Sequence, residues 1–265
     1  MAHAGDTEEF TVHLPGGGRM PLLGFGTWQL RGDSARQAVE WALDAGYRHL
    51  DTATMYGNER EVGAAVATSG LAREDVFVAT KLPPDRVDRP TQTLEQSLEA
   101  LGLAQVDLWL VHWPPGGAAR PDVWEAFVRA RADGLVRDVG VSNYSLGQVD
   151  ELTAATGVTP AVDQVEWSPT LHDPRFLAGC RERGVAPEGY SPFRSGDLTD
   201  PVLGGVAEHH RVTPAQVVVR WHLQHGVAVI PRSARRERIV GNADVYGFVL
   251  DGDEMALLDG LSTVR

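Results

Sequence analysis

The chain alternates short apolar segments of strand type with longer segments of helical period, and the alternation runs through eight units. The strand candidates are 22–28, 47–51, 76–81, 106–112, 136–143, 161–166, 185–191 and 227–233. Helix candidates lie at 34–45, 58–69, 91–101, 121–132, 145–155, 174–183, 213–225, 235–243 and 251–261. This alternation is typical of parallel strands joined by crossover helices, and eight such units close a barrel.

The main alternative is a doubly wound open sheet, which usually carries a glycine-rich phosphate fingerprint after an early strand. The nearest match, GFGTWQ at 24–29, lacks the third glycine and leads into no immediate helix. The sequence therefore predicts an α/β fold, a (β/α)8 TIM barrel, as a single domain over residues 1–265. The segment PGGGRMP at 15–21 indicates a short N-terminal β-hairpin, and the last helix candidate closes the chain as a C-terminal helix.

Charge and composition exclude several classes of function. The formal net charge of −12 argues against general nucleic-acid binding, which needs a basic face. No window reaches the roughly 18 apolar residues of a membrane span, and the first residues lack a signal-peptide core, so we expect a cytoplasmic protein. The single cysteine, Cys180, excludes an internal disulfide and is expected to be a buried structural thiol.

A polar or reactive side chain stands at the end of nearly every strand candidate. These residues are Asp51, Lys81, His112, Ser142, Asn143, Gln164, Tyr190, Ser191, Arg232 and Ser233. In a barrel the carboxyl ends of the strands gather on one face, which is where barrel active sites lie. Chance polar endings explain one or two such positions but not a nearly unbroken ring. The ring also contains Lys81, the only lysine among 24 basic residues.

Three of these positions, together with Tyr56, suggest a proton-delivery site. Asp51 and Lys81 are opposite charges at neighbouring strand ends, and burial favours their pairing. Tyr56 follows in the loop after Asp51, where a nearby ammonium is expected to lower the phenol pKa from its usual value near ~10. His112 can orient a substrate oxygen. The set suits an oxygen that gains negative charge and takes up a proton.

An arginine cluster lies close to the start of the helix candidate at 235–243. Arg232, Arg235, Arg236 and Arg238 gather there in an otherwise acidic chain. Guanidinium groups suit a phosphate dianion, and a helix N-terminus adds a favourable dipole. A solvated basic surface is the alternative, and it fits Arg235 and Arg236 better than the other two.

Six segments resemble, in the same order, the signature blocks of the aldo-keto reductase family. They are GYRHLDTATMYGNEREVG (46–63), VDLWLVHWP (106–114), VGVSN (139–143), DQVEWSP (163–169), GYSPF (189–193) and IPRS (230–233). The resemblance runs from about residue 9 to about residue 261. It implies an enzyme that reduces a small aldehyde or ketone with NADPH and is commonly a monomer.

The resemblance also implies roles for individual residues. Tyr56 matches the proton donor, Asp51 and Lys81 the pair that tunes it, and His112 the residue that positions the carbonyl. The matched cofactor-binding positions are Ser142, Asn143, Gln164, Tyr190, Ser191, Ser195, Arg232, Ser233, Arg238 and Asn242. The expected substrate pocket consists of Trp28, Met55, Trp113 and Phe193.

Three positions depart from the family pattern. Arg232 stands where lysine is more frequent, and Gly241 stands where glutamate is common beside Asn242. Asp163 replaces a frequent asparagine next to Gln164. The change at Arg232 keeps the charge but alters the geometry of phosphate recognition, so the resemblance favours NADPH over NADH without securing that preference.

Other functions have less support in the sequence. The histidine pairs His209–His210 and His222–His225 lack a metal-binding spacing, so we expect solvated helix faces and no metal site. A barrel hydrolase would need paired carboxylates or a set of metal ligands, and the sequence shows neither pattern. A non-catalytic NADPH-binding redox sensor on the same fold is the second hypothesis, although a sensor need not keep all four catalytic groups.

Overall fold

The computed structural model describes residues 10–193 and 198–264. Within those residues, eight parallel strands form one sheet in the order β3-β4-β5-β6-β7-β8-β9-β10. The strands are β3 (Phe25–Gly26), β4 (His49–Asp51), β5 (Phe77–Leu82), β6 (Val106–Val111), β7 (Val136–Ser142), β8 (Val162–Glu166), β9 (Ala186–Tyr190) and β10 (Ala228–Val229). The predicted (β/α)8 barrel is therefore confirmed, with shorter first and last strands than expected.

The barrel closes where the first and last strands meet. Leu23 forms a parallel bridge with Val229, and the Gly24 amide donates to the Val229 carbonyl at 2.9 Å. A Cβ on Gly26 would lie 2.8 Å from the Ile230 carbonyl oxygen, so this approach of the two chains requires glycine.

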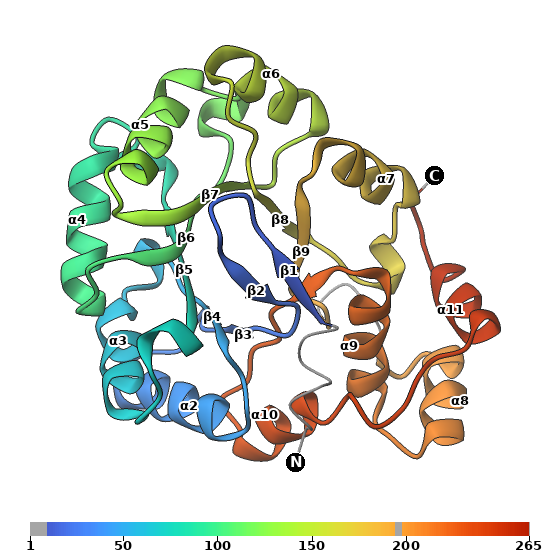
Figure 1. Cartoon of the computed structure of the whole chain (residues 1–265). Helices are drawn as coiled ribbons and strands as arrows, with labels where there is room; N and C mark the ends of the chain where they lie inside the picture. Colours follow the sequence, from blue (N-terminus) through green and yellow to red (C-terminus); the bar gives the residue numbers. More distant parts are fainter. Residues whose placement is uncertain (1–9, 194–197, 265) are drawn as a thin grey trace.

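A ring of helices surrounds the barrel (Figure 1). The helices are α2 (Gly32–Asp44), α3 (Glu59–Thr68), α4 (Pro90–Leu101), α5 (Pro121–Ala132), α6 (Leu146–Thr156), α7 (Pro174–Arg183), α8 (Pro201–His210), α9 (Pro214–His225), α10 (Arg236–Ala243) and α11 (Gly252–Asp259). The expected C-terminal helix, α11, lies on the outside of the ring near α8 and α9 (Figure 1). Several short 3₁₀ turns lie between a strand and the helix after it; among them, η1 (Thr54–Tyr56) follows β4, and η5 (Pro169–Leu171) follows β8.

The predicted hairpin, β1 (Thr11–His13) and β2 (Arg19–Pro21), lies across the end of the barrel at which the strands begin (Figure 1). The carboxylate of Asp138 in β7 accepts from the backbone amides of Gly16 at 2.5 Å and Gly18 at 3.0 Å. These bonds fix the hairpin turn on the barrel. The opposite end, where the strands finish, carries the polar ring that the sequence indicates.

The layer between strands and helices is tightly packed with apolar side chains. Trp109 of β6 stacks on Phe127 of α5 with ring centroids 3.6 Å apart. Cys180 lies in the same core with no exposed surface, and burial raises the pKa of its thiol to about 12. Cys180 is thus the structural thiol that the sequence suggests.

The sequence patterns miss one helix and misplace two helix starts. Helix α8 contains Gly204 and Gly205, which have low helix propensity and hide its period. Its one clear signal is the N-cap at Asp200, whose side chain accepts from the Val202 amide at 2.8 Å. The sequence predicts N-caps at Asp33 or Ser34 for α2 and at Thr91 for α4, but these helices begin earlier, after Arg31 and Arg89. Ser145 and Thr213, which the sequence also predicts as N-caps, do cap α6 and α9.

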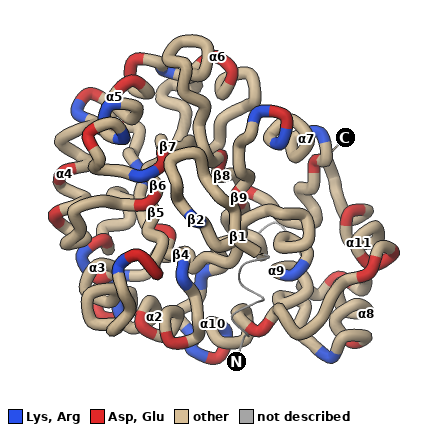
Figure 2. The backbone as a smooth tube through the Cα atoms, viewed as in Figure 1, with Lys and Arg blue, Asp and Glu red and all other residues tan. Residues whose placement is uncertain are grey.

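Charged positions of both signs are interspersed around the helices (Figure 2). Among the residues that the structure describes, no helix has the length and apolar character that a membrane crossing requires.

Candidate active site

A buried ion pair occupies the carboxyl ends of two neighbouring strands. Asp51 is the last residue of β4, and Lys81 lies near the end of β5. The Lys81 Nζ atom lies 2.7 Å and 2.5 Å from the two carboxylate oxygens of Asp51 and donates to the Thr52 carbonyl at 2.9 Å. Neither charged side chain is more than 2 % exposed. The pair forms as the sequence predicts, because each charge has its partner within the barrel.

Tyr56 lies beside this pair, at the end of the η1 turn. Its hydroxyl oxygen is 3.4 Å from Lys81 Nζ, and the ammonium lies 5.0 Å from the centre of the phenol ring. The turn is held in place by Asn58, whose side chain donates to the carbonyls of Thr27 at 2.9 Å and Leu30 at 3.1 Å. These buried hydrogen bonds tie the loop that carries Tyr56 to the segment that follows β3.

The direction of the Tyr56 pKa shift differs from the sequence expectation. Burial raises the pKa of the phenol and outweighs the nearby ammonium of Lys81, which acts in the opposite direction. The expected net lowering is therefore wrong. Although burial alone would lower the pKa of Lys81, Asp51 and Tyr56 raise it on balance. At neutral pH the site presents a neutral phenol next to a charged ammonium.

His112 follows β6 and faces the same site. Its ring centre lies 5.7 Å from that of Tyr56 in an edge-on arrangement. Burial, followed by the charge of Lys81, lowers the pKa of His112 to about 3, so the imidazole is neutral. A neutral imidazole beside a phenol can hold a carbonyl oxygen through one N–H without adding a second positive charge.

The ends of the next strands supply amide and hydroxyl groups. The Ser142 hydroxyl donates to the Gln164 carbonyl at 2.7 Å. The Tyr190 hydroxyl donates to the side-chain oxygen of Asn143 at 2.9 Å, and Asn143 adopts a left-handed φ of 61°. Ser142, Asn143, Gln164 and Tyr190 therefore belong to one hydrogen-bonded group, as the strand-end pattern indicates.

Gln164 connects this group to the ion pair. Its Nε2 atom donates to Asp51 at 2.9 Å and to Glu188 at 3.0 Å. Glu188 lies in the middle of β9, is fully buried, and faces His49 with a shortest N–O distance of 3.4 Å. Glu188 is not among the site residues that the sequence predicts. The signal available in the sequence was a glutamate inside a strand candidate; its pairing with Gln164 is seen only in the register of β8 and β9.

The residues expected around a phosphate lie at the start of α10. Arg232 donates to the side-chain oxygen of Gln29, and Ser233 accepts from the Arg235 amide at 3.0 Å. Arg238 is exposed, whereas Asn242 is buried on the same helix. Ser191 adopts a left-handed φ of 53° at the end of β9. Ser195 lies outside the described residues.

Three large apolar side chains remain open to solvent around the site. Trp28, Met55 and Trp113 are 44 %, 55 % and 41 % exposed. The Trp113 ring lies 6.5 Å from that of Tyr190 and 6.2 Å from that of His112, so it borders the polar side chains at the strand ends. Phe193 differs because it is half-buried and packs against the apolar core. Exposed aromatic rings beside buried polar groups are typical of a site that closes on a partly apolar ligand.

The expectation of solvated histidine faces is wrong for two residues of α9. His222 is fully buried, with its ring nitrogens 2.7 Å from the Val218 carbonyl and 3.3 Å from the Trp167 carbonyl. His225 is mostly buried and lies 2.8 Å from a carboxylate oxygen of Asp259. Neither side chain therefore lies on a solvated helix face.

Comparison with known proteins gives one consistent result. The model of the Aldo/keto reductase family matches residues 22–263. An aldo-keto reductase of Mycolicibacterium smegmatis is 41 % identical over 256 residues, covering 95 % of this chain and 93 % of the relative. The crystal structure of an aldo/keto reductase from Brucella melitensis superposes with a TM-score of 0.90 at 38 % identity, covering 95 % of this chain and 98 % of that one. The Bombyx mori aldo-keto reductase in complex with NADP superposes with a TM-score of 0.87 at 32 % identity, covering 96 % and 94 %.

Proposed function

Because this chain belongs to the aldo/keto reductase family, we propose that it reduces an aldehyde or ketone to the alcohol with NADPH, with Tyr56 as the proton donor. The observation that carries the proposal is the buried group formed by Tyr56, Lys81 and Asp51, with His112 facing the phenol. Such a group suits a reaction in which an oxygen atom becomes an alkoxide and must be protonated.

The residues around this group fit a nicotinamide cofactor. Both hydrogens of the Gln164 side-chain amide are bound to carboxylates, so the side-chain oxygen is the atom that would accept from the nicotinamide carboxamide. Ser142 and Asn143 add hydroxyl and amide groups at the same strand ends, and the Tyr190 ring offers a flat surface for stacking. Arg232, Ser233 and Arg238 would hold the 2′-phosphate, and Asn242 the adenine side.

NADPH, when bound, supplies the hydride that the carbonyl carbon accepts. The protein residues act on the oxygen. His112, as a neutral imidazole, donates one N–H to the carbonyl oxygen and orients it toward Tyr56. The raised pKa of Tyr56 keeps the phenol protonated at neutral pH, so its proton is available when the oxygen gains charge.

Lys81 stabilises the phenolate that remains after proton transfer. Its ammonium lies 3.4 Å from the Tyr56 oxygen, and Asp51 keeps that ammonium charged in the barrel interior. The O–H bond of Tyr56 breaks, the substrate oxygen takes the proton, and water at the open side of the site restores the phenol. Trp28, Met55 and Trp113 border that open side and are the proposed contacts for the organic part of the substrate.

The test is consumption of NADPH, followed by its absorbance, with a panel of aldehydes and ketones. Tyr56→Phe keeps the ring but removes the proton, and we expect turnover to fall by a factor of roughly 10² to 10⁴. Binding of NADPH, followed by quenching of tryptophan fluorescence, should stay near that of the unchanged protein. Normal turnover by Tyr56→Phe would contradict the role of this residue.

The same assay distinguishes the redox-sensor hypothesis from the enzyme. A sensor would bind NADPH tightly and consume it with no member of the panel. An enzyme consumes NADPH with at least one carbonyl, and the consumption depends on Tyr56.

A further inference from the structure

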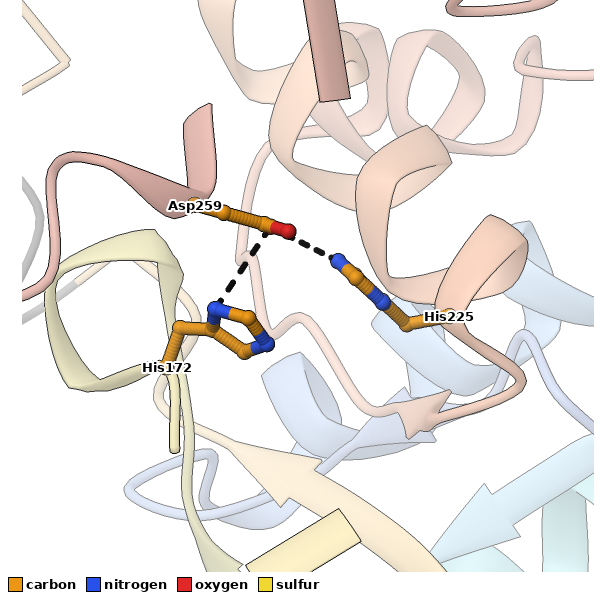
Figure 3. A group of neighbouring side chains, drawn as sticks. All are labelled: His172, His225 and Asp259. Carbon is orange, nitrogen blue, oxygen red and sulfur yellow. Dashed lines mark hydrogen bonds and ion pairs between the residues drawn. The ribbon is translucent and has the colours of Figure 1, made fainter. Parts of the chain in front are cut away.

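Three metal-ligating side chains from separate segments meet beside α11 (Figure 3). His172 follows η5, His225 is the last residue of α9, and Asp259 is the last residue of α11. Figure 3 shows both imidazole rings directed at the same carboxylate. We refer to these three residues as the α11 cluster.

The distances within the α11 cluster fit a small divalent ion. His225 Nε2 lies 2.8 Å and His172 Nδ1 lies 3.6 Å from Oδ1 of Asp259. The three ligand atoms all lie within 4.8 Å of one another. In a tetrahedral zinc site the metal–ligand bonds measure about 2.0 to 2.1 Å, which places the ligand atoms about 3.3 Å apart. Shifts of a few tenths of an ångström to somewhat over 1 Å would therefore bring the three atoms around one ion.

The surroundings hold the cluster in this arrangement. The Trp221 indole donates to Oδ1 of Asp259 at 2.8 Å and so orients the carboxylate, as hydrogen bonds to metal-bound ligands commonly do. The chain after α11 is fixed to the loop that carries His172, because the Ser262 hydroxyl donates to the His172 carbonyl at 2.7 Å. These contacts hold the Asp259 carboxylate and the backbone of His172 in place, and neither of them uses an imidazole nitrogen of the cluster.

An ordinary ion pair explains only part of the cluster. Oδ1 of Asp259 already accepts a hydrogen bond from the Trp221 indole and lies within hydrogen-bond distance of His225 Nε2. His172 Nδ1, at 3.6 Å from the same oxygen, lies beyond hydrogen-bond distance. Two imidazole nitrogens with one carboxylate oxygen favour a zinc-type ion over calcium or magnesium, which prefer oxygen ligands.

We propose that His172, His225 and Asp259 bind a Zn²⁺-type ion, with water as the fourth ligand, and that this ion ties α11 to α9 and η5. A second group, His209, His210 and Glu254, suits an ion less well. His209 is 70 % exposed there, whereas His172 and His225 are only 8 % and 19 % exposed. The second group therefore provides a matched control.

The experiment uses the full chain, freed of metal by a chelator and titrated with ZnCl₂ by calorimetry. We expect one ion per chain with His172 and His225 as ligands, and at least a roughly tenfold weaker affinity in His225→Gln and in Asp259→Asn. Asp259→Asn keeps an oxygen that can accept from Trp221, so it tests the ligand with little change of packing. Replacement of Zn²⁺ by Co²⁺ should give the visible absorption of a tetrahedral site.

His210→Gln is the control, and its affinity for Zn²⁺ should stay unchanged. Saturating Zn²⁺ should raise the Tm of the unchanged protein by about 5 °C and leave that of His225→Gln unaffected. Failure to bind Zn²⁺ at about 100 µM would overturn the proposal. Binding that survives His225→Gln but is lost in His210→Gln would overturn it as well, because it would assign the ion to the second group.

Discussion

The side-chain nitrogen of Gln164 lies 3.0 Å from Oε2 of Glu188 and donates to it inside the barrel. The same nitrogen donates to Asp51 at 2.9 Å, so both amide hydrogens are bound to carboxylates. An amide nitrogen between two acceptors leaves the amide oxygen turned away from them. Glu188 is therefore a positioning residue: it fixes the side of Gln164 that would meet the nicotinamide carboxamide.

Replacing Glu188 with methionine tests this relationship. The variant removes one acceptor from Gln164, and we expect the affinity for NADP⁺ to fall by roughly tenfold, the order of one lost hydrogen bond. The affinity for 2′,5′-ADP should not change, because this fragment carries the 2′-phosphate but no nicotinamide. Fluorescence titration of both ligands gives the comparison. Glu188→Gln keeps an acceptor oxygen and should bind NADP⁺ like the unchanged protein; equal losses for the two ligands would point to a general structural effect instead.

Lys81→Met should lower both stability and turnover, for different reasons. Removing the ammonium leaves the Asp51 carboxylate buried without its partner, and breaking a buried pair costs about 3 to 5 kcal/mol of unfolding free energy. Adding Asp51→Asn to the same chain removes the unpaired charge. We expect the double variant to regain most of the stability, measured by urea unfolding, while NADPH consumption stays low. Recovery of both quantities together would show that Lys81 is structural and not part of catalysis.

The meeting of Asp51, Lys81 and His112 at one face of the barrel could be predicted from the sequence because all three stand at strand ends. Asp51, Lys81 and His112 each close an apolar segment, and parallel strands bring such positions to one face whatever the exact register. Glu188 could not be found in this way. It stands inside a strand, and its importance depends on the register that pairs it with Gln164, which composition and period do not determine.

The direction of the Tyr56 pKa shift and the surroundings of His225 show a second limit of prediction from sequence. The sequence indicates which charge lies near Tyr56 but not how deeply the phenol is buried, and burial decides the direction of the shift. Likewise, the period of α9 does not reveal that α11 returns to cover its end, where Asp259 meets His225. Both depend on tertiary contacts between segments far apart in the chain.

Cofactor preference should depend on Arg238. The side chain is exposed near the start of α10, where a guanidinium can reach the 2′-phosphate that distinguishes NADPH from NADH. We expect Arg238→Gln to raise the KM for NADPH roughly 10- to 100-fold, the order of a charge-assisted hydrogen bond, with little effect on the KM for NADH. Arg236→Gln removes the same charge from the same helix and serves as the control. Equal effects of the two substitutions would indicate a general loss of positive potential.

Asp163 precedes Gln164 in β8, so its side chain points to the opposite face of the strand, where it is buried. Its Oδ2 atom is buried with no hydrogen-bond partner among the described residues, and Oδ1 accepts from the Tyr144 amide at 3.5 Å. Burial raises the pKa of this carboxyl to about 8, so the folded protein holds it protonated near neutral pH. In the unfolded chain the carboxyl ionises near pH ~4.

Asp163→Asn should therefore stabilise the protein more as the pH rises. Between pH ~4 and pH 8 the folded state binds one more proton at Asp163 than the unfolded state does, so this group lowers stability by about 1.4 kcal/mol per pH unit. Urea unfolding of both chains at pH 5, 6 and 7 should show the gap widening. The buried histidines His112 and His222, whose lowered pKa values give the opposite slope, are common to both chains and cancel. A gap that stays constant with pH would mean that Asp163 is ionised in the folded protein.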